Sequence, residues 1–202
     1  MTEQSKHKMR YRLNNRDNDT PMPTQLFLDT EWADLEGEQL VSLALISADG
    51  QRRFYAERAV LPAEPTAFVK ENVYPLLERG VVALPDAVFS EKLNRFLGSV
   101  SDPVVLYDYA VDEVMLDMAV KGFPKRGDPR SRASSERAVR RELVRDDLIS
   151  MILEDWFLAN PEEAARRHHA MVDANALRLA WLAASGLLDA PWSASWRQFH
   201  DQ

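Results

Sequence analysis

The stretch Leu26-Phe27-Leu28-Asp29-Thr30-Glu31-Trp32 sets two acids directly after a short apolar run. The run predicts a strand over residues 25–28, with Asp29 and Glu31 at its end. Side chains two residues apart on extended backbone share a face, so both carboxylates can bind one cation. Oxygen ligands favour hard ions such as Mg²⁺ or Mn²⁺. Surface strands often carry such pairs, and the apolar run before this one is what favours a metal site.

The rest of the chain predicts an α/β (α+β) domain. Strands are expected at residues 25–28, 40–47, 53–56, 104–107 and within 148–158. Helices are expected at residues 66–77, with an interruption at Pro75, and at residues 85–97, 112–121 and 169–188. In residues 148–158 we expect a strand rather than a helix because the sheet then gains a fifth member. Three antiparallel strands followed by strand, helix, strand and helix indicate a layered domain, not a bundle or barrel.

Length and composition fit one domain. The chain has 202 residues, of which 46% are apolar, and this supplies a sizeable single core. We expect a disordered N-terminal arm over residues 1–23 and one folded domain over residues 24–202. No apolar run approaches the ~18 residues of a membrane span, and the polar N-terminus lacks the plan of a signal peptide. The absence of cysteine excludes disulfides and thiolate chemistry, and it suits a cytoplasmic location.

Charge is unevenly distributed along the chain. The formal net charge of −7 argues against a protein that coats nucleic acid non-specifically. Residues 121–145 nevertheless carry nine Lys/Arg against three acids. In this basic segment Arg126, Arg130 and Arg132 are candidates for contacts with substrate phosphates. The alternatives are an ordinary solvated loop and helix face, or a surface that binds an acidic patch of a second subunit.

A third acid follows the fourth predicted strand. Asp112 lies in the first turn of a predicted helix, where Asp is common because it complements the helix dipole. Asp108, four residues earlier, competes with it for any catalytic role.

A histidine and a fourth acid fall in the pattern H-x-A-x-x-D, as His168, Ala170 and Asp173. The small Ala170 permits close approach to the sheet while Asp173 points inward. A histidine titrates near neutral pH and can accept a proton from an attacking water. Taken alone, residues 166–169 (RRHH) are more typical of a solvated helix turn.

Taken in order, LFLDTEW (26–32), YDYAVDEVML (107–116) and HHAMVDA (168–174) resemble the three motifs of the DEDDh branch of 3′-to-5′ exonucleases. The resemblance spans about residues 25–190 and, with FVKENVYPLL (68–77), looks closest to a compact bacterial exoribonuclease subgroup. It implies a ribonuclease-H-like fold with a five-stranded mixed sheet in the order 3-2-1-4-5. It also implies an active site with two divalent cations, Mg²⁺ or Mn²⁺.

The resemblance implies a role for each residue of the site. Asp29 would bridge both cations, and Glu31 and Asp173 would complete one of them. Asp112 would hold the other cation, largely through water. His168 would be the general base.

Further residues near these motifs are candidates for substrate contacts. The family often has Asn where this chain has Asp108, which could alter metal affinity or substrate placement, or face solvent. Residues just after the first motif contact the terminal nucleotide in the family, so Trp32 could stack on a base for ~1–3 kcal/mol. Core or edge packing is an equal alternative for Trp32. Tyr107 and Tyr109 are weaker candidates for the same role.

These observations predict a metal-dependent 3′-to-5′ exonuclease that hydrolyses single-stranded RNA to nucleoside 5′-monophosphates. The preference for RNA over DNA comes from the subgroup resemblance, since no residue reveals a contact to a 2′-hydroxyl. A DNA exonuclease of the repair or proofreading type and a non-cleaving nucleic-acid-binding protein on the same fold are the alternatives. No membrane partner is expected. The Trp192/Trp196 tail, which we expect to pack onto the body, permits a homodimer contact.

Overall fold

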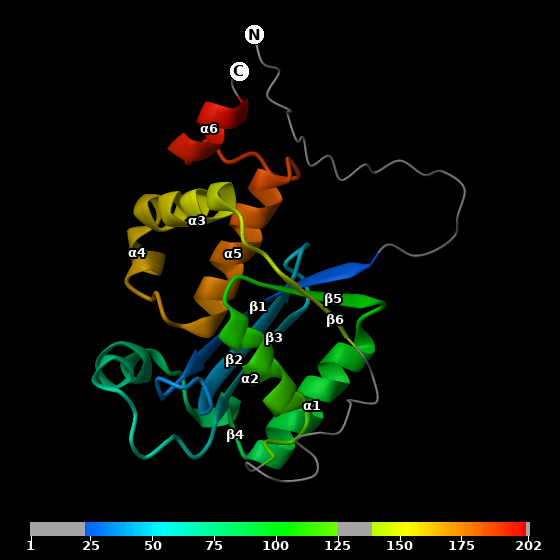
Figure 1. Cartoon of the computed structure of the whole chain (residues 1–202), viewed down its shortest axis with the longest axis vertical. Coiled ribbons are helices and arrows are strands. Elements are labelled where there is room, and N and C mark those ends of the chain that lie inside the picture. Colours follow the sequence, from blue (N-terminus) through cyan, green and yellow to red (C-terminus); the bar gives the residue numbers. More distant parts are fainter. Residues whose placement is uncertain (1–22, 125–138, 201–202) are drawn as a thin grey trace.

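A computed structural model describes residues 23–124 and 139–200, and six strands within these ranges form one mixed sheet (Figure 1). The strands are β1 (Thr24–Trp32), β2 (Leu40–Ser47), β3 (Arg53–Arg58), β4 (Ala83–Leu84), β5 (Pro103–Tyr107) and β6 (Arg140–Leu143). Their order is β4-β3-β2-β1-β5-β6. The pairs β1–β2 and β2–β3 are antiparallel, whereas β3–β4, β1–β5 and β5–β6 are parallel. The α/β class is as predicted, with six strands in place of five.

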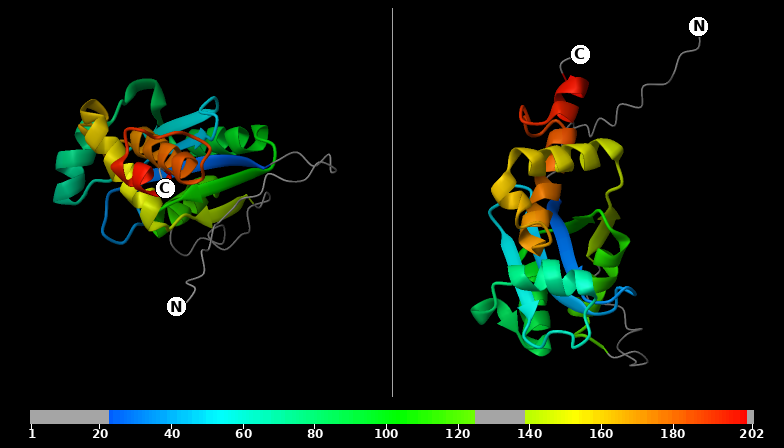
Figure 2. Two further views of the ribbon diagram at one scale, coloured as in Figure 1. Left: turned by 90° about the horizontal axis from the view of Figure 1, so that it is seen from above. Right: turned by 90° about the vertical axis from the view of Figure 1, so that its left-hand side faces the viewer.

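Helices cover both faces of this sheet (Figure 2). They are α1 (Asp86–Ser99), α2 (Ala110–Val120), α3 (Asp147–Ala159), α4 (Pro161–Ala164), α5 (Ala170–Ala184) and α6 (Ala194–His200). Three short helical turns, η1 (Val69–Val73), η2 (Tyr74–Leu76) and η3 (Gly80–Val82), lie between β3 and β4. One face carries α1 and α2, the opposite face carries α3 and α5, and α6 lies against α3.

β1 lies inside the sheet, and its alternating side chains contribute to both layers. Successive residues of a strand point to opposite faces. Leu26 and Leu28 belong to the core under α1 and α2, whereas Phe27 belongs to the core under α3 and α5. The neighbouring β2 is buried along its whole length, as expected for a strand covered on both faces. Asp29 and Glu31 follow Phe27 at odd positions, so β1 presents them to the α5 face.

β1 is longer than the sequence predicted. It continues through Trp32, so Asp29 and Glu31 lie inside the strand rather than at its end. Both acids stay in register with β2, opposite Ala44 and Ser42, because backbone pairing does not require apolar side chains. The register shifts between Glu31 and Trp32. Irregularities of this kind re-aim side chains next to functional sites.

The strand expected within residues 148–158 is wrong, because this segment forms α3. Its buried residues recur every three or four positions, at Ile149, Ile152, Trp156 and Phe157, which is the period of a helix. The position beside β5 is taken instead by β6, from the basic segment. The charged side chains of β6 suit an edge strand, where they oppose pairing with another chain. The additional strand, β4, has only two residues, which are too few to show the alternating pattern of a strand in the sequence.

The other predicted elements agree more closely. Helices expected at residues 85–97, 112–121 and 169–188 are confirmed as α1, α2 and α5. Residues 66–77 form only η1 and η2, since Pro75 has no N–H for a continuous helix. Trp192 and Trp196 pack back onto the body, partly buried against the core under α3 and α5. The expected N-terminal arm, Pro23 excepted, lies outside the described residues. No helix within residues 23–124 and 139–200 combines the length and apolar content needed to cross a membrane.

The N-terminus of α3 gives a test of this fold. The Asp146 carboxylate accepts hydrogen bonds from the N–H groups of Leu148 (2.8 Å) and Ile149 (3.4 Å). We expect Asp146→Ala to lower the free energy of unfolding by about 1 kcal/mol, because these N–H groups lose their acceptor. That loss corresponds to a melting temperature about 2–4 °C lower in thermal denaturation. The control is Asp147→Ala at the neighbouring exposed position, and an equal loss there would contradict a capping role.

Candidate active site

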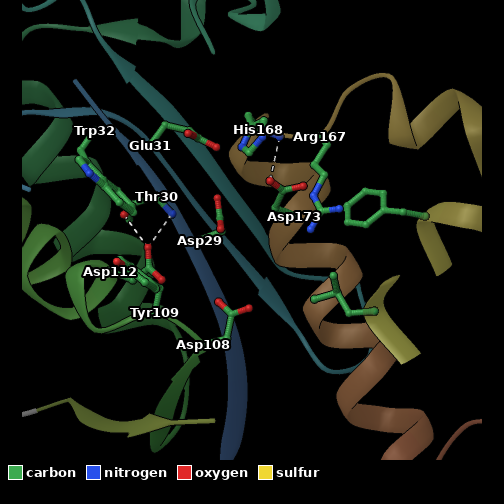
Figure 3. A pocket seen from close by; sticks show the side chains of 12 residues that line it. Asp29, Thr30, Glu31, Trp32, Asp108, Tyr109, Asp112, Arg167, His168 and Asp173 are labelled. Atoms are coloured by element: carbon green, nitrogen blue, oxygen red, sulfur yellow. Dashed lines mark hydrogen bonds between the residues drawn. The ribbon is translucent and has the colours of Figure 1, made fainter. Parts of the chain in front are cut away.

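The three predicted motifs meet in one cavity of about 200 Å³ (Figure 3). β1 supplies one wall, the end of β5 with the first turn of α2 supplies the second, and the segment from α3 to α5 supplies the third. The lining residues are Asp29, Thr30, Glu31, Trp32, Asp108, Tyr109, Asp112, Leu153, Phe157, Arg167, His168 and Asp173. The structure therefore brings all four predicted carboxylates and the predicted histidine together.

Asp112 is fixed by the strand residue that lies between the two acids of the first motif. The Thr30 N–H donates to Asp112 Oδ1 at 3.1 Å, and the Thr30 hydroxyl donates to the same oxygen at 2.7 Å. Thr30 points to the α2 face of β1 while its two acidic neighbours point to the other face. Sequence reasoning missed this residue, although its place between Asp29 and Glu31 was the available signal. The second oxygen, Asp112 Oδ2, is buried and accepts no hydrogen bond from the described residues.

His168 and Asp173 are held together by a tight turn ahead of α5. The His168 backbone has φ 75°, a left-handed conformation that side-chain-bearing residues seldom adopt. In this conformation its N–H donates to Asp173 Oδ2 at 2.9 Å. The His168 ring also lies edge-on to Phe68, with ring centroids 4.9 Å apart. One ligand atom each from Glu31, His168 and Asp173 all lie within 4.8 Å of one another.

The neighbouring His169 has a structural role. Its side chain is buried and stacks on the Tyr55 ring at a centroid distance of 4.7 Å. Its Nε2 lies 3.3 Å from Glu78 Oε1. These contacts anchor the start of α5 to β3 and leave His168 as the histidine that lines the cavity.

The aromatic candidates separate into two groups. Trp32 and Tyr109 line the cavity and stack on each other, with ring centroids 5.6 Å apart and an interplanar angle of 7°. Trp32 also packs against the core under α1 and α2, so packing and exposure to the cavity coexist in one side chain. Tyr107 is buried away from the cavity, and its hydroxyl donates to Glu113 Oε2 at 2.6 Å. The structure thus brings Tyr109, and not Tyr107, to the site.

The loop after β1 is held against the start of α2. Gly37 has φ 65°, and a Cβ added there would lie 2.7 Å from Val111 Cγ1. Only glycine allows both this backbone conformation and this close approach. The contact fixes the loop that follows Trp32 on the helix that carries Asp112.

The predicted set of metal ligands and general base did not include two charged residues that line the cavity. Asp108, which the sequence left open, lines the cavity and adds a fifth carboxylate. Arg167 also lines it, although the run of Arg and His around it was typical of a solvated turn. The three arginines proposed for phosphate contacts, Arg126, Arg130 and Arg132, lie outside the described residues.

Burial, followed by repulsion within the cluster, perturbs the titration of the four carboxyls. Burial, followed by repulsion from Asp173 and Asp112, raises the pKa of both Asp29 and Glu31 well above their ordinary values. Burial raises the pKa of Asp112 to about 7 against the opposing hydrogen bonds from Thr30. Burial likewise raises the pKa of Asp173 to about 7, opposed by the hydrogen bond from the His168 N–H.

The donor atoms fit divalent cations. Three carboxylate oxygens, Asp29 Oδ2, Asp112 Oδ2 and Asp173 Oδ1, are buried and receive no hydrogen bond from the described residues. Buried polar atoms are normally paired, so unpaired anionic oxygens in one cavity indicate a missing positive partner. A set made almost wholly of carboxylates suits a hard ion such as Mg²⁺ or Mn²⁺.

Comparison with protein-family models and with curated proteins finds no match for this chain.

The raised pKa values give a stability test. The folded state holds protons on these carboxyls at pH values where the unfolded chain, with pKa values near 4, has lost them. Without divalent ions, stability should therefore fall as the pH rises from about 4 through the value of about 7 of Asp112 and Asp173. We expect Asp29→Asn to weaken this fall, because it removes a buried charge and its repulsion from the other acids. The melting temperature in EDTA at about pH 8 should rise by about 2–4 °C for each kcal/mol of this cost removed.

Thermal denaturation in EDTA across this pH range is the measurement. Asp189→Asn, at an exposed acid outside the cavity, is the matched control. Mg²⁺ should stabilise the wild type more than Asp29→Asn at the upper end of the range. An Asp29→Asn variant with the pH dependence of the control would contradict the electrostatic account.

Proposed function

We propose that this protein is a metal-dependent 3′-to-5′ exonuclease that hydrolyses single-stranded RNA to nucleoside 5′-monophosphates. The observation that carries the proposal is the convergence of four carboxylates and one histidine in a single cavity, with three carboxylate oxygens left without a donor. A ribonuclease-H-like fold is part of the proposal. The run β3-β2-β1-β5-β6, with two acids on the inner strand β1, supports it because this is the order that the motif resemblance implied.

The carboxylates would hold two cations, Mg²⁺ or Mn²⁺, with the division of roles that the resemblance implies. Asp29 would contribute to both, Glu31 and Asp173 to one, and Asp112 to the other. Bound divalent cations supply Lewis-acid stabilisation of negative charge on the reacting phosphodiester. Thr30 orients Asp112 through two hydrogen bonds, and the His168 N–H orients Asp173. Both acids therefore keep one oxygen free for a ligand.

In this proposal His168 would act as the general base. The atoms it presents to the cavity lie close to Glu31 and Asp173, where the attacking water would be bound. Burial, together with the charge of Arg167, lowers the pKa of His168. The ring is then neutral at physiological pH and can accept the proton that the water loses.

The aromatic residues that line the cavity support a terminal nucleotide as the substrate group. The stacked pair Trp32 and Tyr109 forms one side of it, and Tyr109 is 54% exposed. Base stacking on aromatic rings tolerates any sequence, as an exonuclease requires. The choice of RNA over DNA comes from the motif resemblance, and the first experiment compares the two.

That experiment is digestion of a 5′-labelled single-stranded RNA and its DNA counterpart by the wild type and by Asp29→Ala. With Mg²⁺ or Mn²⁺ we expect a ladder that shortens from the 3′ end, faster on RNA, and no ladder in EDTA. Asp29→Ala should abolish turnover, because it removes the carboxylate that would contribute to both cations. Asp189→Ala is the matched control and should cut like the wild type.

The outcomes separate the competing functions. Faster cutting of DNA would favour the DNA exonuclease. Binding without cutting by a folded, metal-loaded wild type would favour the non-cleaving alternative and overturn the proposal.

His168→Ala tests the assignment of the base separately from metal binding. Turnover should fall by about 10²–10⁴-fold, the usual contribution of a general base. The rise in melting temperature caused by Mg²⁺ should persist, because the four carboxylates remain. Loss of that Mg²⁺ effect in thermal denaturation would show that His168 is a metal ligand instead.

A further inference from the structure

Arg167 is the only Lys or Arg among the described residues that line the acidic cavity. It directly precedes His168, and Figure 3 shows its side chain extending beside Asp173. A guanidinium in this cavity is a counter-charge that opposes the rise in the pKa of Asp173, but it would also repel bound cations. It is expected if an anionic group enters together with them.

The guanidinium is held in one orientation from two sides. Its Nη1 and Nη2 donate to the two Glu154 oxygens at 2.9 and 2.5 Å, a forked pair. Its plane also lies over the Phe157 ring, with Cζ 4.7 Å from the ring centroid. Both partners belong to α3. Arginine has five N–H donors, so this arrangement leaves three for another acceptor.

Stability alone does not account for this arrangement. The side chains of Arg167 and Glu154 are 41% and 54% exposed, and ion pairs at such positions contribute little to folding. What the fork and the ring provide is a fixed direction for the remaining donors. Donors that are already oriented stabilise developing charge most effectively, because they need no rearrangement during the reaction.

We propose that Arg167 donates hydrogen bonds to a non-bridging oxygen of the phosphodiester that is cleaved. This inference rests on the proposed nuclease function and adds a residue that touches the reacting group. Planar guanidinium matches phosphate oxygens better than ammonium does, and it stays charged at any physiological pH. The position beside His168 and Asp173 sets the bound phosphate next to the base and the metal ligands.

The test compares Arg167→Gln, Arg167→Lys and the matched control Arg166→Gln. Arg166 is the preceding residue, pairs only loosely with Glu163 (3.9 Å) and does not line the cavity. Melting temperatures are measured first, and Arg167→Lys keeps the charge should Arg167→Gln fold poorly. Cleavage of 5′-labelled single-stranded RNA in Mg²⁺ gives kcat and KM. Binding of the same RNA in the Asp29→Asn background gives the dependence of Kd on salt.

We expect kcat/KM to fall roughly 10- to 100-fold in Arg167→Gln, the size of one lost charge-assisted hydrogen bond. The slope of log Kd against log salt should flatten by about 0.7, the value for one phosphate contact on a single strand. Arg167→Lys should keep the slope but lose much of kcat/KM, because it retains charge without the fork. Arg166→Gln should match the wild type in both readouts.

Other outcomes distinguish a failure of this inference from a failure of the nuclease function on which it rests. If the wild type cuts RNA while Arg167→Gln keeps the wild-type slope and kcat/KM, the function stands and the Arg167 contact is overturned. If the wild type binds RNA without cutting and Arg167→Gln flattens the slope, the phosphate contact stands and the nuclease function falls. A wild type that neither binds nor cuts overturns both.

Discussion

Burial of two carboxylates on the inner strand of the sheet, beside the acids of the other two motifs, is the constraint on which this structure depends. Asp29 and Glu31 lie on β1, and burial and the nearby acids raise the pKa of both. Such a cluster persists only if the backbone around it cannot yield. β1 is hydrogen-bonded to β2 through both acids and to β5 just before them, and apolar cores cover both of its faces. The sheet thus maintains an arrangement that the side chains by themselves oppose.

The two-residue period of one strand organises the whole site. Odd positions of β1 direct Asp29 and Glu31 toward α5, where Asp173 lies. The even position between them directs Thr30 toward α2, where it binds Asp112 through backbone and side chain. One strand therefore fixes Asp112 relative to its own acids and directs those acids toward Asp173, which the His168 N–H holds. The two helices need no direct contact with each other for the four carboxylates to converge.

Much of this could be predicted from sequence, and the exceptions have physical causes. Short apolar runs and helical periodicity were enough to predict β2, β5, α1, α2 and α5. The order of the acidic motifs was enough to select the residues that share the cavity. Counting strands favours a strand within residues 148–158, whereas the spacing of Ile149, Ile152 and Trp156 is that of a helix. Arg167 was missed because its partners lie on a neighbouring helix and leave no local pattern. Thr30, whose partner Asp112 lies 82 residues away, was indicated only by its place between two acids.

The wrongly assigned segment has the largest consequence for chemistry. As a strand it would have extended the sheet, but as α3 it lies against α5 and forms the wall opposite α2. That wall carries Leu153 and Phe157, which limit water and lower the local dielectric around the acids. It also carries Glu154, which with Phe157 holds the guanidinium of Arg167. A lower dielectric strengthens the repulsion among the carboxylates. It equally strengthens their attraction to a cation and the attraction of Arg167 to a phosphate. The same helix therefore raises the free energy of the carboxylate cluster alone and lowers the free energy of the cluster with its ligands bound.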